Sequence, residues 1–410
     1  MTAPQLPADR PTAVVVGLDC ITGLQTARIL ADRGVPVTGV VADRDHFCAK
    51  TRHANRLVVS PTSGERLIET LVRLASSLSG PAVLLPCTDG AVLAISRWRE
   101  RLGSYRFVLP DHDVVEMLMD KVSFTEHALR TGLPIPSTRI LRGRTDALEA
   151  AGSMPWPAVL KPALKTPGWV AATSTKAFRV GDGEALLAAW DRWSDAADGV
   201  MIAQAWIEGG ETALYSANAY FDREGQPRVV FIARKIRQWP PQTGTSSLGE
   251  EVRDDAVRET AIDLFRGVGY RGLAYLEMKL DARTGQRLIV EPNVGRPTGR
   301  SAIAECGGVE LIYSAYRDAL GEPLPEATEQ TYRGVKWIYW RHDLQAAAVQ
   351  MARRELSPLG WWRSVRGHRC EAVFDRRDPR PFAIDLLRTL ATAAGMVRRR
   401  GRSPRTGSSK

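Results

Sequence analysis

Two acidic residues and an amide fall in a strand–turn–strand pattern late in the chain. Glu277 lies in the predicted strand 272–280, Glu291 ends the next predicted strand, and Asn293 follows two residues later. A hairpin of this kind lets the two carboxylates face each other across neighbouring strands. Carboxylate and amide oxygens are ligands that Mg²⁺ takes, with phosphate oxygens and water in its other positions. Two solvent-facing acids on an edge hairpin are the alternative interpretation.

Two lysines precede this hairpin at positions suited to phosphate. Lys121 lies in a predicted helix, and Lys161 ends an apolar strand 40 residues later. A lysine at a strand end beside a loop can hold a phosphate as a point charge. A further strand over 201–207 leads into a turn and Glu211. Phosphate-binding lysines upstream of a metal-binding hairpin would suit a nucleotide site.

In this order and spacing, the segments resemble the ATP-grasp superfamily over residues 111–322. The resemblance implies that Lys121 and Lys161 contact ATP phosphates and that Glu211 holds the ribose hydroxyls. It also implies two Mg²⁺ (or Mn²⁺) ions, with Glu291 as the bridging ligand. The metal positions implied by the resemblance are Glu277, Glu291 and Asn293. The implied adenine hinge, acting largely through backbone groups, is Gln204, Ala205, Trp206 and Ile207.

The sequence departs from the family pattern at two places. The loop 163–169, where the family usually has a glycine-rich phosphate cover, contains one glycine. The family commonly places an arginine two residues after the metal-binding Asn, whereas this chain has Gly295 there and Arg296 next. Arg296 is therefore the predicted catalytic equivalent. A surface salt bridge is its alternative role.

Three cations, Arg234, Lys235 and Arg237, follow an apolar strand and precede a predicted loop over 240–249. Such a group suits a developing acyl phosphate or a substrate carboxylate, and Lys235 is the second predicted catalytic residue. A solvated charged edge would give the same pattern.

The Trp-rich C-terminal region, with Trp337 and the pair Trp361–Trp362, makes the chain look most like carboxylate–amine ligases of the D-aspartate ligase type. This resemblance implies that a small-molecule carboxylate attacks the γ-phosphate of ATP and becomes an acyl phosphate. An amine substrate then displaces phosphate, which leaves an amide and ADP. A binding protein that uses a decayed ATP site as a nucleotide sensor is the alternative from a different class, and the complete set of metal positions argues against it.

The elements that must position these residues are predicted to alternate between strand and helix. Short β-branched runs predict a doubly wound parallel sheet in roughly the first 110 residues. The turn 17–23 lacks the G-x-G-x-x-G spacing of a dinucleotide site, so an NAD-dependent dehydrogenase is a lesser alternative. The predicted N-terminal strands are 12–17, 35–41, 83–86 and 107–110, with a helix over 23–34. Later elements are predicted as strands 157–162, 201–207, 212–221, 229–233, 272–280 and 287–291, and helices 115–132, 254–267 and 344–354.

The expected fold class is α/β and α+β, with a Rossmann-like (pre-ATP-grasp) sheet followed by a two-subdomain ATP-grasp fold and a C-terminal addition. A chain of 410 residues is long enough for several structural units. The predicted units are an N-terminal domain 1–112, a small subdomain 113–195, a large subdomain with the metal site 196–328, a Trp/Arg-rich addition 329–395 and a basic tail 396–410.

The net charge of +10 is concentrated at the C-terminus, because residues 353–410 carry 15 Lys and Arg against 5 Asp and Glu. A main body without excess charge does not predict a nucleic-acid partner, although weak contact of the tail with anionic membranes is an alternative. Five cysteines without a paired spacing, no apolar run of about 20 residues and no secretion signal over 1–11 predict a cytoplasmic protein. A homodimer is the family-based expectation.

Overall fold

The computed structural model describes residues 10–164, 166–173, 175–241 and 244–389. Its N-terminal sheet is five-stranded, all parallel, with the order β3-β2-β1-β4-β5. The predicted doubly wound sheet is confirmed. Its elements are β1 (Ala13–Val16), α1 (Ile21–Ala31), β2 (Val37–Val41), β3 (Arg56–Val59), α2 (Gly64–Ala75), β4 (Ala82–Pro86), α3 (Asp89–Arg97) and β5 (Tyr105–Arg106).

Two details of this sheet differ from the prediction. Residues 56–59 form an edge strand that the sequence analysis did not predict; its apolar run is only three residues long, and its two end residues are exposed. The predicted strand 107–110 is wrong: pairing ends at Arg106, and the following residues leave the sheet. Val108 instead packs on Gly272, where a Cβ atom would lie 2.4 Å from the Val108 carbonyl oxygen.

The predicted helix 115–132 is two helices, α4 (His112–Met119) and α5 (Lys121–Thr131). Asp120 between them has an extended backbone, and its carboxylate accepts a hydrogen bond from the Ser123 amide at 2.8 Å. An N-cap of this type starts a new helix. Lys121 is therefore the first residue of α5.

A small antiparallel sheet with the order β6-β9-β7-β8 follows. The helices α6 and α8 pack on it around Trp169 and Trp190. The elements of this part are β6 (Thr138–Leu141), α6 (Arg144–Ser153), β7 (Ala158–Pro162), α7 (Pro167–Ala172), β8 (Phe178–Val180), α8 (Gly183–Trp193) and β9 (Met201–Ala205).

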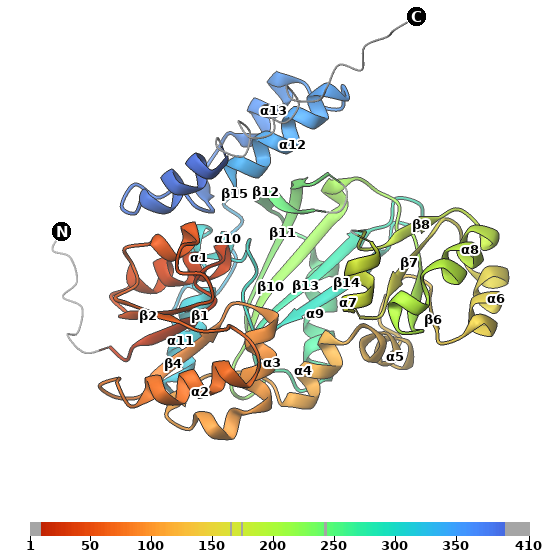
Figure 1. Ribbon diagram of the computed structural model, residues 1–410. Coiled ribbons are helices and arrows are strands. Elements are labelled where there is room, and N and C mark those ends of the chain that lie inside the picture. Colours follow the sequence, from red (N-terminus) through yellow and green to blue (C-terminus); the bar gives the residue numbers. More distant parts are fainter. Residues whose placement is uncertain (1–9, 165, 174, 242–243, 390–410) are drawn as a thin grey trace, which may run out of the picture.

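A seven-stranded sheet with the order β14-β13-β10-β11-β12-β15-β16 forms the centre of the molecule. In Figure 1 its long strands lie between the N-terminal sheet and the small sheet. Its strands are β10 (Leu214–Phe221), β11 (Pro227–Trp239), β12 (Thr245–Glu251), β13 (Gly272–Leu280), β14 (Arg287–Val294), β15 (Lys336–Ile338) and β16 (Arg369–Glu371). The helices are α9 (Asp255–Gly267), α10 (Ile303–Cys306), α11 (Leu311–Ala319), α12 (Trp340–Ala352) and α13 (Pro358–Val365).

The predicted loop 240–249 is wrong in its second half, because β12 begins at Thr245 and pairs with β11 and β15. Its sequence, TSSLGEE, contains one large apolar residue, Leu248, so the local pattern gives little strand signal. The pairing with β15 also makes the C-terminal region part of the central sheet. Within the described residues, none of the helices combines the length and the apolarity needed to cross a bilayer.

Candidate functional site

The two acids of the hairpin face each other on the central sheet. Glu277 on β13 is the register partner of Glu291 on β14, and Tyr275 is the partner of Asn293. The predicted hairpin is therefore confirmed, and it brings all three proposed metal ligands to one stretch of two strands.

The electrostatics of this pair favour a cation. Burial, and next the neighbouring carboxylate of Glu277, raise the pKa of Glu291. Glu277 accepts hydrogen bonds from Lys235 Nζ at 3.1 Å and from the Tyr275 hydroxyl at 3.2 Å. Two carboxylates held together in a buried site are costly unless a positive charge lies close to both.

This donor set fits Mg²⁺. Among the described residues there is no cluster of three or more His, Cys, Asp or Glu side chains. Two carboxylates and the amide of Asn293 supply only oxygen ligands in small number, which suits an ion that keeps water and phosphate oxygens in its coordination shell. An ion held by this donor set would take its remaining ligands from water or phosphate oxygens.

Arg296 reaches the metal site instead of forming only a surface salt bridge. Its Nη2 donates to Asn293 Oδ1 at 3.0 Å, and its Nε donates to Asp89 Oδ1 at 2.6 Å. Asp89 begins α3 of the N-terminal sheet and was not predicted as a site residue. The N-terminal sheet thus contributes directly to the wall of the site.

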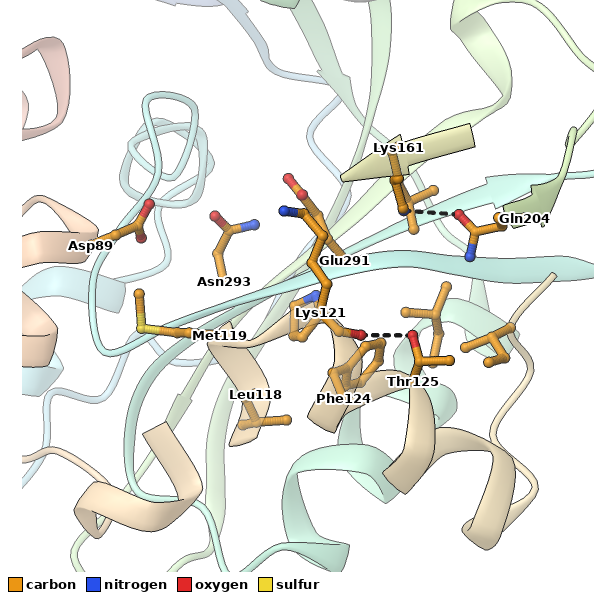
Figure 2. A pocket seen from close by; sticks show the side chains of 14 residues that line it. Asp89, Leu118, Met119, Lys121, Phe124, Thr125, Lys161, Gln204, Glu291 and Asn293 are labelled. Carbon is orange, nitrogen blue, oxygen red and sulfur yellow. Dashed lines mark hydrogen bonds between the residues drawn. The ribbon is translucent and has the colours of Figure 1, made fainter. Parts of the chain in front are cut away.

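The two predicted phosphate lysines border one cavity of about 150 Å³. Figure 2 shows Lys121, Lys161, Gln204, Glu291 and Asn293 around it. Lys161 Nζ donates to Gln204 Oε1 at 3.1 Å, and Lys121 Nζ donates to the Ala163 carbonyl at 3.0 Å. Burial, with a smaller effect of the Lys121 charge, lowers the pKa of Lys161 to about 8. Two ammonium groups therefore share one small space with Glu291 and Asn293, two of the proposed metal ligands.

The predicted adenine hinge lines a neighbouring cavity of about 250 Å³ together with Lys235, Glu277 and Lys279. The Trp206 amide donates to the Pro157 carbonyl at 2.9 Å. The Trp206 carbonyl accepts from Arg283 Nη2 at 3.0 Å, and the Ile207 carbonyl from Lys279 Nζ at 2.8 Å. An adenine ring that paired with these carbonyls would compete with Arg283 and Lys279 for the same acceptor atoms.

Glu211 lines a cavity that the three proposed metal ligands do not line. This cavity has a volume of about 610 Å³ and is also lined by Trp206 and Lys279. Glu211 Oε2 accepts from the Gln238 amide at 3.2 Å and from Gln350 Nε2 at 3.3 Å. Because Gln350 belongs to α12, the C-terminal region contacts a predicted nucleotide-binding residue.

The glycine-poor loop after Lys161 continues into the short helix α7. Thr166 caps this helix by accepting from the Trp169 amide at 3.0 Å, and the Trp169 side chain is 1% exposed. A buried tryptophan anchors this segment where the family usually has a glycine-rich cover.

Of the three cations on β11, only Lys235 lines the site. Arg234 pairs with Glu250 at 2.6 Å, and Arg237 pairs with Asp343 of α12 at 2.8 Å. The two arginines are thus held in ion pairs and do not line these cavities with Lys235, because alternate residues of a strand point to opposite faces and the bulge after Lys235 re-aims Arg237.

A third cavity, of about 580 Å³, joins the metal ligands to residues that the sequence did not indicate. Its wall includes Glu277, Glu291 and Asn293 on one side and Arg300 on another. The C-terminal region contributes Trp337, Tyr339 and His342, and the N-terminal sheet contributes Ile21 and Thr22. A local signal existed only for Arg300, which lies four residues after Arg296 in the polar run that follows β14.

The turn 17–23 is closed on itself. A Cβ atom on Gly23 would lie 2.2 Å from the Gly17 carbonyl oxygen and 2.6 Å from Leu18 Cα. Cys20 caps α1 here by accepting from the Gly23 amide. The glycine serves helix–strand packing, which leaves the dehydrogenase alternative without structural support.

Comparisons with known proteins agree with this geometry, although no family model matches the sequence. The chain is 28% identical over 292 residues to a D-aspartate ligase of Enterococcus faecium, covering 67% of this chain and 68% of that protein. It is 24% identical over 223 residues to a D-alanine–D-alanine ligase of Stutzerimonas stutzeri, covering 50% and 66%. The match thus spans about two thirds of the length of each relative.

Among solved structures, the chain is similar to the biotin carboxylase domain of the 2-oxoglutarate carboxylase of Hydrogenobacter thermophilus. The TM-score is 0.59 at 16% identity, covering 78% of this chain and 72% of that one. That domain was crystallised as a dimer in complex with MgADP and bicarbonate.

The chain has the ATP-grasp fold. Both curated relatives are ligases, which supports an enzyme of the ATP-grasp ligase type. Within this class it is similar to D-aspartate ligase over a longer stretch than to D-alanine–D-alanine ligase.

Proposed function

We propose that this protein is a carboxylate–amine ligase that works through an acyl phosphate. A carboxylate oxygen of the first substrate bonds to the γ-phosphorus of ATP, and the bond from that phosphorus to the ADP oxygen breaks. The nitrogen of the amine then bonds to the acyl carbon, phosphate leaves, and the amine loses a proton. The products are an amide, ADP and phosphate.

The observation that carries this proposal is that Glu291 and Asn293 line both the lysine cavity and the larger cavity, which Glu277, the register partner of Glu291, also lines. Nucleotide phosphates held by Lys121 and Lys161 would therefore lie across the strand β14 from a second substrate. Such an arrangement aligns the acid with the phosphoryl group that it must attack.

The protein's own residues supply binding, charge and exclusion of water. Glu277, Glu291 and Asn293 would hold two Mg²⁺ ions, which offset charge on the transferring phosphoryl group when bound. Lys235, buried at 6% exposure beside Glu277, would stabilise charge that develops on the acid as it is phosphorylated. Arg296 fixes the amide of Asn293 and so orients one ligand.

The test is release of ADP and phosphate with MgATP across a panel of amino acids, small carboxylic acids and amines. Turnover should require an acid, and EDTA should abolish it. Equal ATP hydrolysis in the presence of EDTA would contradict the metal assignment. ATP binding without turnover on any acid–amine pair would favour the sensor alternative.

The remaining expectations are part of the same proposal. A dimer in solution is proposed from the family, and light scattering tests it. The cytoplasmic location also stays a prediction, and the basic tail 396–410 lies outside the described residues.

A further inference from the structure

Arg300 is a buried cation that forms no ion pair with an acid among the described residues. It lies between β14 and α10 and is 3% exposed. Nη1 donates to Ser246 Oγ at 2.9 Å, and Nη2 donates to Ser216 Oγ at 2.8 Å and to the Tyr275 hydroxyl at 3.1 Å. Its Nε is buried without a hydrogen-bond partner among the described residues.

The other deeply buried arginines show what is missing. Arg28 and Arg237 each pair with an aspartate, at 2.9 and 2.8 Å. Within the described part of the chain, Arg300 has hydroxyl partners but no carboxylate in ion-pair range. A buried guanidinium without a counter-charge is costly, so it is normally retained where an anion completes it.

The chain also makes space for this side chain. A Cβ atom on Gly249 of β12 would lie 2.7 Å from Arg300 Cδ. The glycine therefore permits the arginine to pass β12 and to reach the wall of the 580 Å³ cavity.

The wall of this cavity carries more basic than acidic side chains, which favours an anionic ligand. Four basic side chains line it, against two acidic ones. The two acids are Glu277 and Glu291, which the metal would neutralise. The basic residues are Lys176, Lys235, Arg296 and Arg300.

Arg300 lies close to the proposed reaction centre but separate from it. The Tyr275 hydroxyl accepts from Arg300 and donates to Glu277 Oε2, so two hydrogen bonds connect the arginine to a proposed metal ligand. The two hydrogen bonds, of 3.1 and 3.2 Å, place Arg300 and Glu277 on either side of one hydroxyl group, so a small molecule with two carboxylates could contact both ends of this hydrogen-bonded chain. An acid with a single carboxylate can satisfy the reaction centre or Arg300, but not both.

We propose that the first substrate is a dicarboxylic acid whose non-reacting carboxylate binds to Arg300. This inference rests on the proposed function. A carboxylate suits this role, because it supplies the missing counter-charge and can accept from Nε, which has no partner among the described residues. Arg300 thereby selects the acid, while Glu277, Glu291 and Lys235 act on the carboxylate that is phosphorylated.

The first test compares acids on the unaltered enzyme. Both enantiomers of aspartate are assayed for ADP release beside alanine, β-alanine, asparagine and isoasparagine, each of which lacks one of the two carboxylates. One enantiomer of aspartate should exceed all the monocarboxylates in kcat/KM by about a hundredfold or more, because the site would otherwise keep an unpaired buried charge.

The second test changes the arginine. Arg300→Gln should raise KM for aspartate about a hundredfold, and Arg300→Lys about tenfold, with KM for ATP unchanged. Without nucleotide, aspartate should raise the melting temperature of the unaltered protein but not of Arg300→Gln. Arg237→Lys is the matched control, since it alters an equally buried arginine that should affect stability and not the preference between acids.

Three outcomes decide the matter. Equal kcat/KM for aspartate and the monocarboxylates overturns the role of Arg300 and leaves the ligase proposal standing. An equal loss on both kinds of acid in Arg300→Gln also overturns it. ADP release with none of the acid–amine pairs overturns the ligase proposal itself, and this inference with it. If Arg300→Gln does not fold, the comparison of acids and Arg300→Lys still decide.

Discussion

Lys235 and Arg237 lie two residues apart on β11, and each is a buried cation in an ion pair. Their exposures are 6% and 2%, and their partners, Glu277 and Asp343, lie 3.1 and 2.8 Å away. The pairs differ in what surrounds them. Lys235 and Glu277 border cavities.

The Arg237 pair is closed by further hydrogen bonds. Arg237 also donates to Ser364 Oγ at 2.8 Å, and Asp343 also accepts from Trp361 Nε1 at 3.0 Å. A pair whose donors and acceptors are all used within the protein fastens the C-terminal region to the sheet. A pair that borders a cavity can exchange its partner for a ligand, so burial and charge alone do not identify a functional cation.

The largest effect is expected on the open side, from Glu291→Gln. Gln keeps the shape of Glu but cannot serve as a charged bridging ligand, so turnover should fall by about a thousandfold or more. Without nucleotide, the melting temperature should stay equal or rise, since repulsion from Glu277 is removed. An ADP-release assay and thermal melts of one preparation give both values. Near-normal turnover in the folded variant would refute the metal site.

Lys235→Met should act on the same side more weakly. Met retains most of the buried stem but removes the charge beside Glu277, so kcat should fall about a hundredfold. Steady-state kinetics at saturating ATP measures this. A change in KM for ATP alone would place Lys235 in nucleotide binding instead.

Arg237→Met should break the closed side. It leaves Asp343, which is fully buried, without its counter-charge, and should cost about 3–5 kcal/mol of unfolding free energy. Below the melting transition, kcat should be close to normal. Urea unfolding gives the stability, and a large loss of kcat in the folded variant would show that the two pairs are not separate in role.

Lys161→Met should remove a pH-dependent contribution to the stability of the protein, which comes from a cation that borders the lysine cavity. Because burial lowers the folded-state pKa of Lys161 to about 8, the unfolded chain binds more protons between about pH 8 and the ordinary lysine pKa. The cost of burying the charge is therefore complete below pH 8 and disappears as the pH rises through that window. At pH 7 the variant should be more stable by about 1–2 kcal/mol, and the difference should vanish near pH 11. Thermal melts from pH 6 to about 11 measure it. A gain that does not depend on pH would show that packing is its source.

The smallest effect is expected outside both regions. Removal of residues 398–410 should leave kcat and KM within about twofold, because this charged segment has no apolar periodicity with which to pack. The same ADP-release assay on the truncated protein checks this. Loss of turnover in a truncated protein with normal melting would place the tail in the site.

Much of the site is local in the sequence and was predicted from it. Glu277, Glu291 and Asn293 belong to one hairpin, whose alternation and turn are local signals, and β13 begins and ends as predicted. Lys161 is the penultimate residue of the strand β7, one position before the end of the strand. Their roles in catalysis stay predictions.

The remaining parts depend on contacts between residues far apart in the chain. The strand β12 exists because β11 and β15 pair with it, although its own residues carry little strand signal. Arg296 donates a hydrogen bond to Asp89, although the two residues lie 207 positions apart in the sequence. A local pattern contains no information about such partners.

The acid hairpin could be predicted from local alternation and a turn, and the class of enzyme from the resemblance of the ordered segments to the ATP-grasp superfamily. Only the tertiary structure decided which cations face a cavity. Lys235, Arg237 and Arg300 are all basic residues, and local sequence does not distinguish their roles. Asp343 in α12 pairs with Arg237, the bulge on β11 separates Arg237 from Lys235, and Gly249 leaves space for Arg300. Whether a buried charge is matched depends on distant parts of the chain, and that balance separates a structural arginine from one that can bind a substrate.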